Sequence, residues 1–494
     1  MEQIPSLLAS LQPELIPASL HTLDGVFFGL RRTPAGEVQL VLAAPDPGML
    51  DPFHGGRSES MGQTALTGPL DARNAAALRA RFDWLRPRPL GLVTSAGMGD
   101  RLGAATPGHI RALRQAGAGI APIFAQQSIR EMGRTGRTPQ QVMDAALWGM
   151  FAGGWTLGSG ADADHLKQPE DIDACLAAGF TFFTIDPGAH VDDRAAHLDP
   201  AGLRELAGRL PAEVQPAASG LLHRRFSFEG LTLELDEQTL LRAAVKYGAA
   251  VAHVASMYRH LEGAAGGRPF ELEVSVDETE QPTSHAEHLY IACELKRLGV
   301  EWVSLAPRFV GRFEKGVDYI GDLHAFEADI AGHAAIARLL GPYKLSLHSG
   351  SDKFRIYPIA MQATRGMVHL KTAGTSYLEA LHTLAALDSG FFREIYEFAR
   401  GCYETDRLSY HVSASLERAP APDEVVDWPG LLDQFDAREI LHVTFGSVLT
   451  AHDPAGGLRF YPRLMAFLRR QSEAYAEDLK RHFARHLQPF AREG

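Results

Sequence analysis

Residues 160–188, GADADHLKQPEDIDACLAAGFTFFTIDPG, contain the local pattern that most restricts the fold of this chain. Two apolar runs, WTLGSG just before this stretch and FTFFTI within it, are typical of buried strands. Between them Pro169 is predicted to open a helix with an acidic first turn, and Gly179 is predicted to end it. The order predicts a βαβ unit with polar residues after both strands, the edge where parallel α/β folds keep their chemistry. Asp164 and His165 are adjacent, so both can serve one site only where the strand gives way to a loop.

The same alternation of apolar runs and helical patterns continues over residues 89–385. Eight such units are the number found in a (β/α)8 TIM barrel, an α/β fold, which is the predicted fold class. An open doubly wound sheet is the alternative, and it would leave two edge strands to cover. The eight predicted strands are PLGLVTS, IAPIFAQQS, WTLGSGADADH, FTFFTIDPG, PFELEVSVDETE, VEWVSLAPRF, YKLSLHSGSD and MVHLKTAGTS.

The flanking segments are predicted to be smaller additions to this barrel. Residues 1–85 form a small α+β region, in which DGVFFGL and EVQLVLAA pair as strands across the turn RRTPAG. Residues 86–385 form the catalytic barrel, with a mostly helical insertion at about 189–268. Residues 386–494 form a mainly helical C-terminal extension with one late strand-like run, EILHVTFGSVL.

Composition and charge restrict the partners. An apolar content of 45% with 22% charged residues is ordinary for a globular protein, and no run reaches the length of a transmembrane helix. The formal net charge of −12 argues against nucleic acid and anionic membranes, which attract basic surfaces. The first residues lack the basic start and long apolar core of a signal peptide, so a cytoplasmic location is expected. The expected partner is therefore a small molecule, in a protein that can form a homo-oligomer.

Polar side chains gather after most of the predicted barrel strands. His165 and His348 come from different strands, with the inward-facing pair Glu271 and Glu273 between them, which indicates a site for a divalent metal. Two glutamates on one face of a buried strand are costly unless a cation or a proton satisfies them. The alternative is a structural salt-bridge network with Arg308, Lys353 and Lys371. Three further histidines are interpreted as core or surface residues rather than ligands: His369, His382 and His442.

These motifs resemble the zinc-dependent class II ketose-bisphosphate aldolases over about residues 89–385. ADADHLKQPEDIDACLAAGFTFFTIDPG is similar to their Asp-His segment, FELEVSVDETEQ to their glutamate strand with its acidic loop, and LHSGSDKF to their His-Gly-Gly-Ser-Gly-Ser. The resemblance implies a divalent metal (Zn, Mn, Co or Ni) bound by His165, Glu273 and His348. It also implies Asp164 as the acid/base, with Glu278 or Glu280 as a proton carrier on the loop.

Two departures from the aldolase pattern concern the ligands. The segment LAPRFVGRFEKG has no histidine where those enzymes carry their third zinc ligand. His-Ser-Gly-Ser-Asp-Lys replaces the phosphate-binding loop and puts a carboxylate where a phosphate needs backbone N–H groups. A bisphosphate substrate is therefore not expected, and Lys353, Lys371 or Arg308 is predicted to hold a single carboxylate instead.

With LAPRFVGRFEKGVDYIGD, YKLSLHSGSDKF and HLKTAGTSYLEAL, the altered pattern closely resembles the tagaturonate epimerase family over most of the chain. This resemblance implies a metal-dependent epimerase (an isomerase) that interconverts D-tagaturonate and D-fructuronate in hexuronate catabolism, and that can also act on tagatose and fructose. The inverted carbon lies β to the ketone, so retro-aldol cleavage and re-addition account for inversion where simple enolisation cannot. The predicted substrate-binding residues are Gln127, Asp186, Arg308, Ser349, Asp352, Lys353, Lys371 and Thr372.

Two other functions and one other mechanism are compatible with the same residues. A class II-like aldolase acting on a non-phosphorylated sugar acid would release two smaller products. Transient oxidation of the carbinol by a bound nicotinamide is a second route, but no G-x-G-x-x-G follows a strand here. A non-catalytic sugar-acid binding protein is the third, and the full set of acid, base and ligand candidates argues against it.

Overall fold

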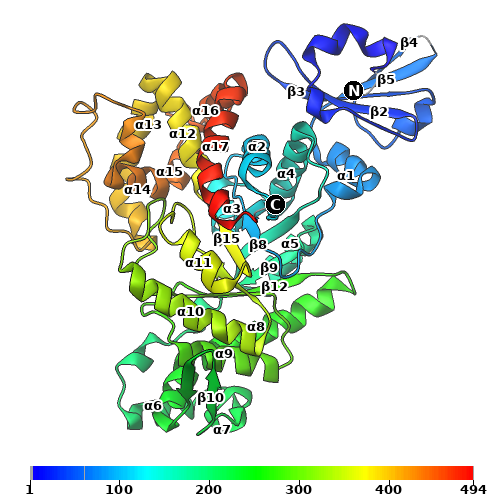
Figure 1. Cartoon of the computed structure of the whole chain (residues 1–494). Helices are drawn as coiled ribbons and strands as arrows, with labels where there is room; N and C mark the ends of the chain where they lie inside the picture. Colours follow the sequence, from blue (N-terminus) through cyan, green and yellow to red (C-terminus); the bar gives the residue numbers. More distant parts are fainter. Residues whose placement is uncertain (1–3, 61, 493–494) are drawn as a thin grey trace.

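The structure is a computed structural model that describes residues 4–60 and 62–492. Its centre is a closed barrel of eight parallel strands, as the alternating pattern predicts (Figure 1). Because the barrel closes, the open-sheet alternative is excluded. The barrel strands, in chain order, are β6 (Ser95–Gly97), β7 (Ala121–Ser128), β8 (Gly160–Leu166), β9 (Phe182–Ile185), β12 (Glu271–Val276), β13 (Ser304–Pro307), β14 (Lys344–Leu347) and β15 (Val368–Lys371).

Helices surround the barrel and connect its strands. The helix predicted between Pro169 and Gly179 is α5 (Pro169–Ala178), with Pro169 in its first turn and Gly179 as a left-handed C-cap. After β12, Ser284 and Glu287 form a capping box that begins the next helix, α9 (His285–Arg297). The other helices of the barrel are α2 (Thr106–Ala116), α3 (Ile129–Thr135), α4 (Pro139–Gly153), α8 (Glu237–Ala265), α10 (Leu323–Leu340), α11 (Tyr357–Thr364) and α12 (Thr375–Leu387).

An antiparallel sheet precedes the barrel and lies at its side in Figure 1. The predicted strand pair is present, with Phe28 opposite Leu42. Both faces of this sheet are covered, since alternate residues of β2 and β3 pack either on the main core or on the N-terminal segment. The sheet consists of β1 (His21–Leu23), β2 (Val26–Arg32), β3 (Val38–Ala44), β4 (Gly56–Ser60) and β5 (Gln63–Gly68), and α1 (Ala72–Arg81) follows it.

The insertion after β9 is more mixed than its helical pattern suggests. Besides α6 (Pro200–Ala207) and α7 (Pro216–Ser219), it contains a hairpin of β10 (Arg225–Phe228) and β11 (Leu231–Glu234). The long α8 then returns the chain to the barrel, and the insertion projects below the barrel in Figure 1.

The C-terminal extension is helical, and the strand expected in its middle is wrong. Residues 439–449 lie instead in α14 (Phe435–Val443) and α15 (Phe445–Thr450), with their apolar side chains in the core. A closed barrel has no free edge for another strand, so this short apolar run packs on helices instead. The other helices are α13 (Ser389–Asp406), α16 (Tyr461–Arg470) and α17 (Ser472–Leu487). In the described part of the chain, no helix has the length and apolarity needed to cross a bilayer.

Candidate active site

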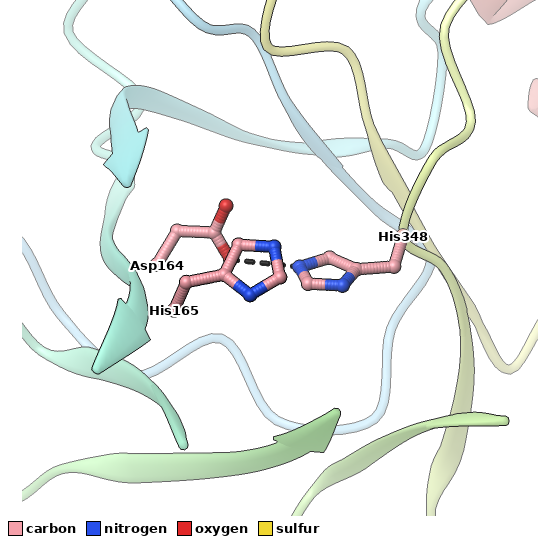
Figure 2. A group of neighbouring side chains, drawn as sticks. All are labelled: Asp164, His165 and His348. Carbon is pink, nitrogen blue, oxygen red and sulfur yellow. Dashed lines mark hydrogen bonds and ion pairs between the residues drawn. The ribbon is translucent and has the colours of Figure 1, made fainter. Parts of the chain in front are cut away.

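Asp164, His165 and His348 meet at the carboxyl ends of β8 and β14 (Figure 2). Their nearest side-chain donor atoms lie within 4.8 Å of one another. The two imidazole rings are 4.4 Å apart between centroids, and Asp164 Oδ1 lies 2.7 Å from His348 Nε2. The structure therefore brings together three of the residues that the sequence predicts for the site.

A local distortion of β8 lets two adjacent residues serve the same site. The pairing of β8 with β9 shifts register between Ala163 and Leu166, and His165 has a left-handed φ of 54°. In a regular strand the two side chains would point to opposite faces. The bulge and the left-handed residue remove that restriction, at an energetic cost that such positions carry at functional sites.

Each histidine is oriented through its Nδ1 atom. His165 Nδ1 lies 3.0 Å from Asp186 Oδ2, and His348 Nδ1 lies 2.8 Å from Asp277 Oδ1. Ser275 Oγ also lies 2.9 Å from His348 Nδ1. A carboxylate on one ring nitrogen fixes the tautomer and directs the other nitrogen outward, as in the histidine ligands of metal proteins. The donor set thus suits a divalent transition metal held by Nε2 atoms.

Lys371 connects three buried carboxylates beneath the histidines. Its Nζ lies 2.9 Å from Asp162 Oδ2, 2.7 Å from Asp164 Oδ1 and 2.9 Å from Glu273 Oε1. Glu273, expected to be a ligand, therefore faces Lys371, and its Oε1 lies 4.0 Å from His348 Nε2. Lys371, expected to hold the substrate, has this salt-bridge network as its environment instead. These ion pairs are of the kind expected in the alternative, a structural salt-bridge network that includes Lys371.

The electrostatics of this cluster favour positive charge between the histidines. Burial opposes ionisation of Asp164, yet Lys371, followed by His348 and His165, holds the pKa of Asp164 well below its ordinary value. Burial also disfavours a charged His348, but Asp277 and Asp164 raise the pKa of His348 well above its ordinary value. Burial raises the pKa of Asp162 to about 7 despite the neighbouring ammonium. An excess of carboxylates that draws a proton onto a buried histidine also favours a metal cation.

In β7, Gln126 and not the predicted Gln127 lies beside Asp164. Gln127, expected to bind the substrate, accepts a hydrogen bond from Arg137 on the helical side of the strand. Its neighbour Gln126 points inward, with Nε2 3.4 Å from Asp164 Oδ2. The cause is a register shift between Ile123 and Ala125, which no sequence periodicity reveals.

Two residues after β14, expected to bind the substrate, have other partners. Lys353 is fully buried, and its Nζ donates to the backbone carbonyls of Glu314, Val317 and Ser351, which occupies all three of its protons. Asp352 lies beside a separate hollow of about 620 Å³ next to α17, where its Oδ1 is 2.6 Å from His482 Nε2. Asp352 thus connects the barrel to the C-terminal helices, whereas Lys353 connects two loops of the barrel, those after β13 and β14.

Some of the remaining predicted site residues are buried away from the open space of the site, and others lie beside it. Asp186 is buried behind His165, and the Thr372 hydroxyl donates to the Gly97 carbonyl, so neither faces an open space. Glu278 lies on an exposed loop with Oε1 3.9 Å from His165 Nε2, and Arg130 donates to the same oxygen. As expected, His369 is a core residue, bonded to Ser95, and His382 contacts Asp478 at the surface; His442 is buried in the pocket wall.

Two connected hollows give access to the site. The inner pocket, about 40 Å³, is lined by Asp164, His165 and His348 together with Lys315, Ser349 and Tyr410. The outer pocket, about 470 Å³, is lined by Glu278, Arg308 and His411, and it shares His348, Lys315, Ser349 and Tyr410 with the inner one. The inner pocket has room for only a few atoms, so a hexose-sized substrate must extend into the outer pocket.

The C-terminal extension covers these pockets, and sequence reasoning missed its contribution. Tyr410 lines both pockets, and its hydroxyl accepts a hydrogen bond from Arg134. Ser413 donates through both its backbone N–H and its hydroxyl to Glu314. Residues 410–413 follow the barrel in the chain and show no motif, so only the folded structure brings them to the site.

Fold and site together define an α/β-barrel enzyme with a histidine–carboxylate centre at the carboxyl ends of its strands. The family model described as tagaturonate epimerase matches residues 17–490. The tagaturonate/fructuronate epimerase of Thermotoga maritima is 42% identical over 476 residues, 96% of each chain. The crystal structure of fructuronate–tagaturonate epimerase from Cohnella laeviribosi superposes with a TM-score of 0.92, at 35% identity and 98% coverage of each chain. A glycerol complex of the same enzyme gives the same values. The chain belongs to the tagaturonate epimerase family and is an epimerase.

Proposed function

We propose that this protein interconverts D-tagaturonate and D-fructuronate by metal-assisted retro-aldol cleavage and re-addition. The observation that carries the proposal is the joining of Asp164, His165 and His348 in one enclosed pocket. The substrates named for the Thermotoga and Cohnella enzymes support the choice of hexuronates.

His165 and His348 are the two histidine ligands of the proposed metal, because carboxylates hold their Nδ1 atoms. His348 Nε2 lies 2.7 Å from Asp164 Oδ1, and a cation would take the place of the proton that they share. Nitrogen donors of this kind suit Zn, Mn, Co or Ni. A divalent cation bound there would polarise the ketone of the substrate and stabilise the negative charge that develops on its oxygen.

Asp164 is the proposed base. It takes the proton from the hydroxyl on the inverting carbon, whose C–O bond becomes a carbonyl as the adjacent carbon–carbon bond breaks. The electron pair of the broken bond moves toward the ketone as an enediolate. Lys371 keeps Asp164 ionised, which makes it ready to accept a proton near neutral pH. After the aldehyde fragment rotates, the bond forms again on the opposite face.

When the carbon–carbon bond forms again, an acid must protonate the new hydroxyl oxygen from a different direction. The hydroxyl of the product points away from the position that it had in the substrate, so one fixed carboxylate serves only one of the two epimers well. Glu278 is the proposed second proton carrier, because its Oε1 lies 3.9 Å from His165 Nε2 on an exposed loop. Arg130, which donates to Glu278, positions this loop residue.

Product analysis tests the proposed function. Metal-loaded protein should convert tagaturonate into fructuronate, and fructuronate into tagaturonate, when either is incubated alone and followed by NMR. In deuterated water the inverting carbon should keep its original hydrogen, because cleavage breaks a carbon–carbon bond and not that C–H bond. Accumulation of three-carbon fragments would identify an aldolase instead, and deuterium at the inverting carbon would identify a deprotonation mechanism.

A further inference from the structure

A uronate differs from a neutral ketose by one carboxylate, so a site that prefers uronates needs a cation without another partner. Five basic residues line the inner pocket: Arg101, Arg130, Lys315, Lys353 and Lys371. Four of them are already neutralised or hydrogen-bonded in full: Lys371 by three carboxylates, Lys353 by three backbone carbonyls, Arg130 by Glu278 and Arg101 by Glu131.

Lys315 is different from these four. Its Nζ donates to Ser349 Oγ at 2.9 Å, and across residues 4–60 and 62–492 no carboxylate lies within ion-pair distance of it. The side chain is half-buried in a loop after β13, where it lines both pockets. An ammonium that has lost part of its water without gaining an acidic partner is unfavourable, and an anionic ligand would remove that cost.

Ser349 adds a second donor at the same point. Its Oγ accepts a hydrogen bond from Lys315, which leaves the hydroxyl proton free to donate to another group. Ser349 directly follows His348, so this pair of donors lies beside one of the two proposed metal ligands. A substrate that extends from the inner into the outer pocket must pass Lys315 and Ser349, because both residues line the two pockets.

We propose that Lys315 and Ser349 form the subsite that binds the carboxylate of the hexuronate and so determine the preference for uronates over neutral ketoses. This inference rests on the proposed function. It replaces Lys353 and Lys371, which the sequence suggested for this task. Arg308, which lines the outer pocket but not the inner one, is the competing candidate for binding the carboxylate.

The test compares a charged and an uncharged substrate. Lys315→Met should raise the KM for tagaturonate roughly 10- to 100-fold, the value of one charge-assisted hydrogen bond, with a smaller change in kcat. The kcat/KM for tagatose, which has no carboxylate, should change little. Ser349→Ala should raise the KM for tagaturonate several-fold, and Lys315→Arg should restore part of the loss.

Controls separate this subsite from a general loss of charge or of folding. Arg355→Met removes an exposed cation a few residues after His348 and should leave both substrates unaffected. A second variant, Lys315→Gln, and the thermal unfolding midpoint of each variant show whether the methionine variant is misfolded. An unchanged KM for tagaturonate, an equal loss for tagatose, or a loss confined to Arg308→Gln would each overturn the assignment.

Failure of the proposed function gives a different result. If the wild-type protein binds tagaturonate without converting it, the epimerase proposal fails. Calorimetry with wild-type and Lys315→Met proteins then still tests the subsite, because the variant should bind tagaturonate 10- to 100-fold more weakly. Equal affinities of the two proteins would disprove the role of Lys315 in either case.

Discussion

At the scale of single residues, Asp164 and His165 are adjacent in the chain but have different proposed roles in one site. In a regular strand their side chains would point to opposite faces. The left-handed backbone of His165 turns its imidazole toward His348, while Asp164 stays within 2.7 Å of Lys371. The proposal gives the cation to the imidazoles and the proton transfer to the carboxylate. These tasks can be separated by experiment because an amide can replace the carboxylate without changing its shape.

Asp164→Asn should keep the fold and the bound metal, while kcat falls by roughly 10²–10⁴, the usual contribution of a positioned acid/base. The asparagine retains hydrogen-bonding capacity toward His348 but cannot accept the substrate proton. His165→Ala should lose metal and activity together. The measurements are metal content by mass spectrometry and turnover at saturating substrate. Loss of metal from Asp164→Asn would make Asp164 a ligand, and near-normal turnover would assign the base to another carboxylate.

At the scale of elements, the agreement between sequence and structure follows the range of the interactions involved. The helix from Pro169 to Ala178 depends on a local start and stop signal, so the sequence predicts it correctly. The sequence predicts Gln127 as a substrate-binding residue, whereas Gln126 points inward, because the pairing of β7 shifts register between Ile123 and Ala125. Residues 439–449 are predicted as a strand but lie in α14 and α15, because a short apolar run has the same pattern in a strand and in a buried helix. In both segments, the residues alone do not show which other parts of the chain they pack against.

The segment 439–449 contains a carboxyl group, that of Glu439, which should make the stability of the fold depend on pH. Burial, followed by the nearby Glu314, raises the pKa of Glu439 on α14 to about 8. Since this pKa is higher in the folded than in the unfolded protein, the folded state binds more protons between about pH 4.5 and 8. The contribution of Glu439 is therefore most favourable at low pH and is lost as the pH rises toward 8.

Glu439→Gln should remove most of this dependence, because the amide is neutral at every pH and can donate to Glu314. Urea unfolding of both proteins at pH 5.5, 7 and 8.5 measures the effect. The free energy of unfolding of the wild type should fall more steeply with pH than that of the variant. Parallel curves would show that Glu439 is ionised in the folded protein at neutral pH.

At the scale of the whole molecule, the barrel positions the chemistry and the segments outside it enclose the pocket. The barrel and the order of its strands follow from the alternating pattern of the sequence. The cover formed by residues 410–413 does not, because its contacts with Arg134 and Glu314 join positions that are far apart in the chain. Lys315 is not among the substrate-binding residues that the sequence predicts, for a related reason: only the structure shows which lysines already have an ionic partner.

Metal binding should stabilise the whole fold, because the histidine ligands come from two different strands and are together only in the native state. Chelation should lower Tm and abolish activity, and a divalent transition metal should restore both. At a hundredfold excess over Kd the gain is about 2.7 kcal/mol. His348→Ala should show no rise in Tm with metal. His324→Ala, at an exposed position on α10, should respond like the wild type. Full activity of metal-free protein would refute the proposed role of the metal.

The segment 410–413, which covers the pockets, should prevent the fragments formed by cleavage from leaving the protein. In the proposed mechanism the protein is an aldolase that retains its fragments, so removing part of the cover should release some of them. Tyr410 is the side chain of the extension that lines both pockets, held there by Arg134. Tyr410→Ala should lower kcat/KM and yield a slow, steady appearance of three-carbon products by NMR, while the wild type yields none. Tyr461→Ala, at a tyrosine of the same extension on α16 that lines neither pocket, should behave like the wild type. If Tyr410→Ala slows epimerisation tenfold or more without ever releasing fragments, cleavage of the carbon–carbon bond is not the route of inversion.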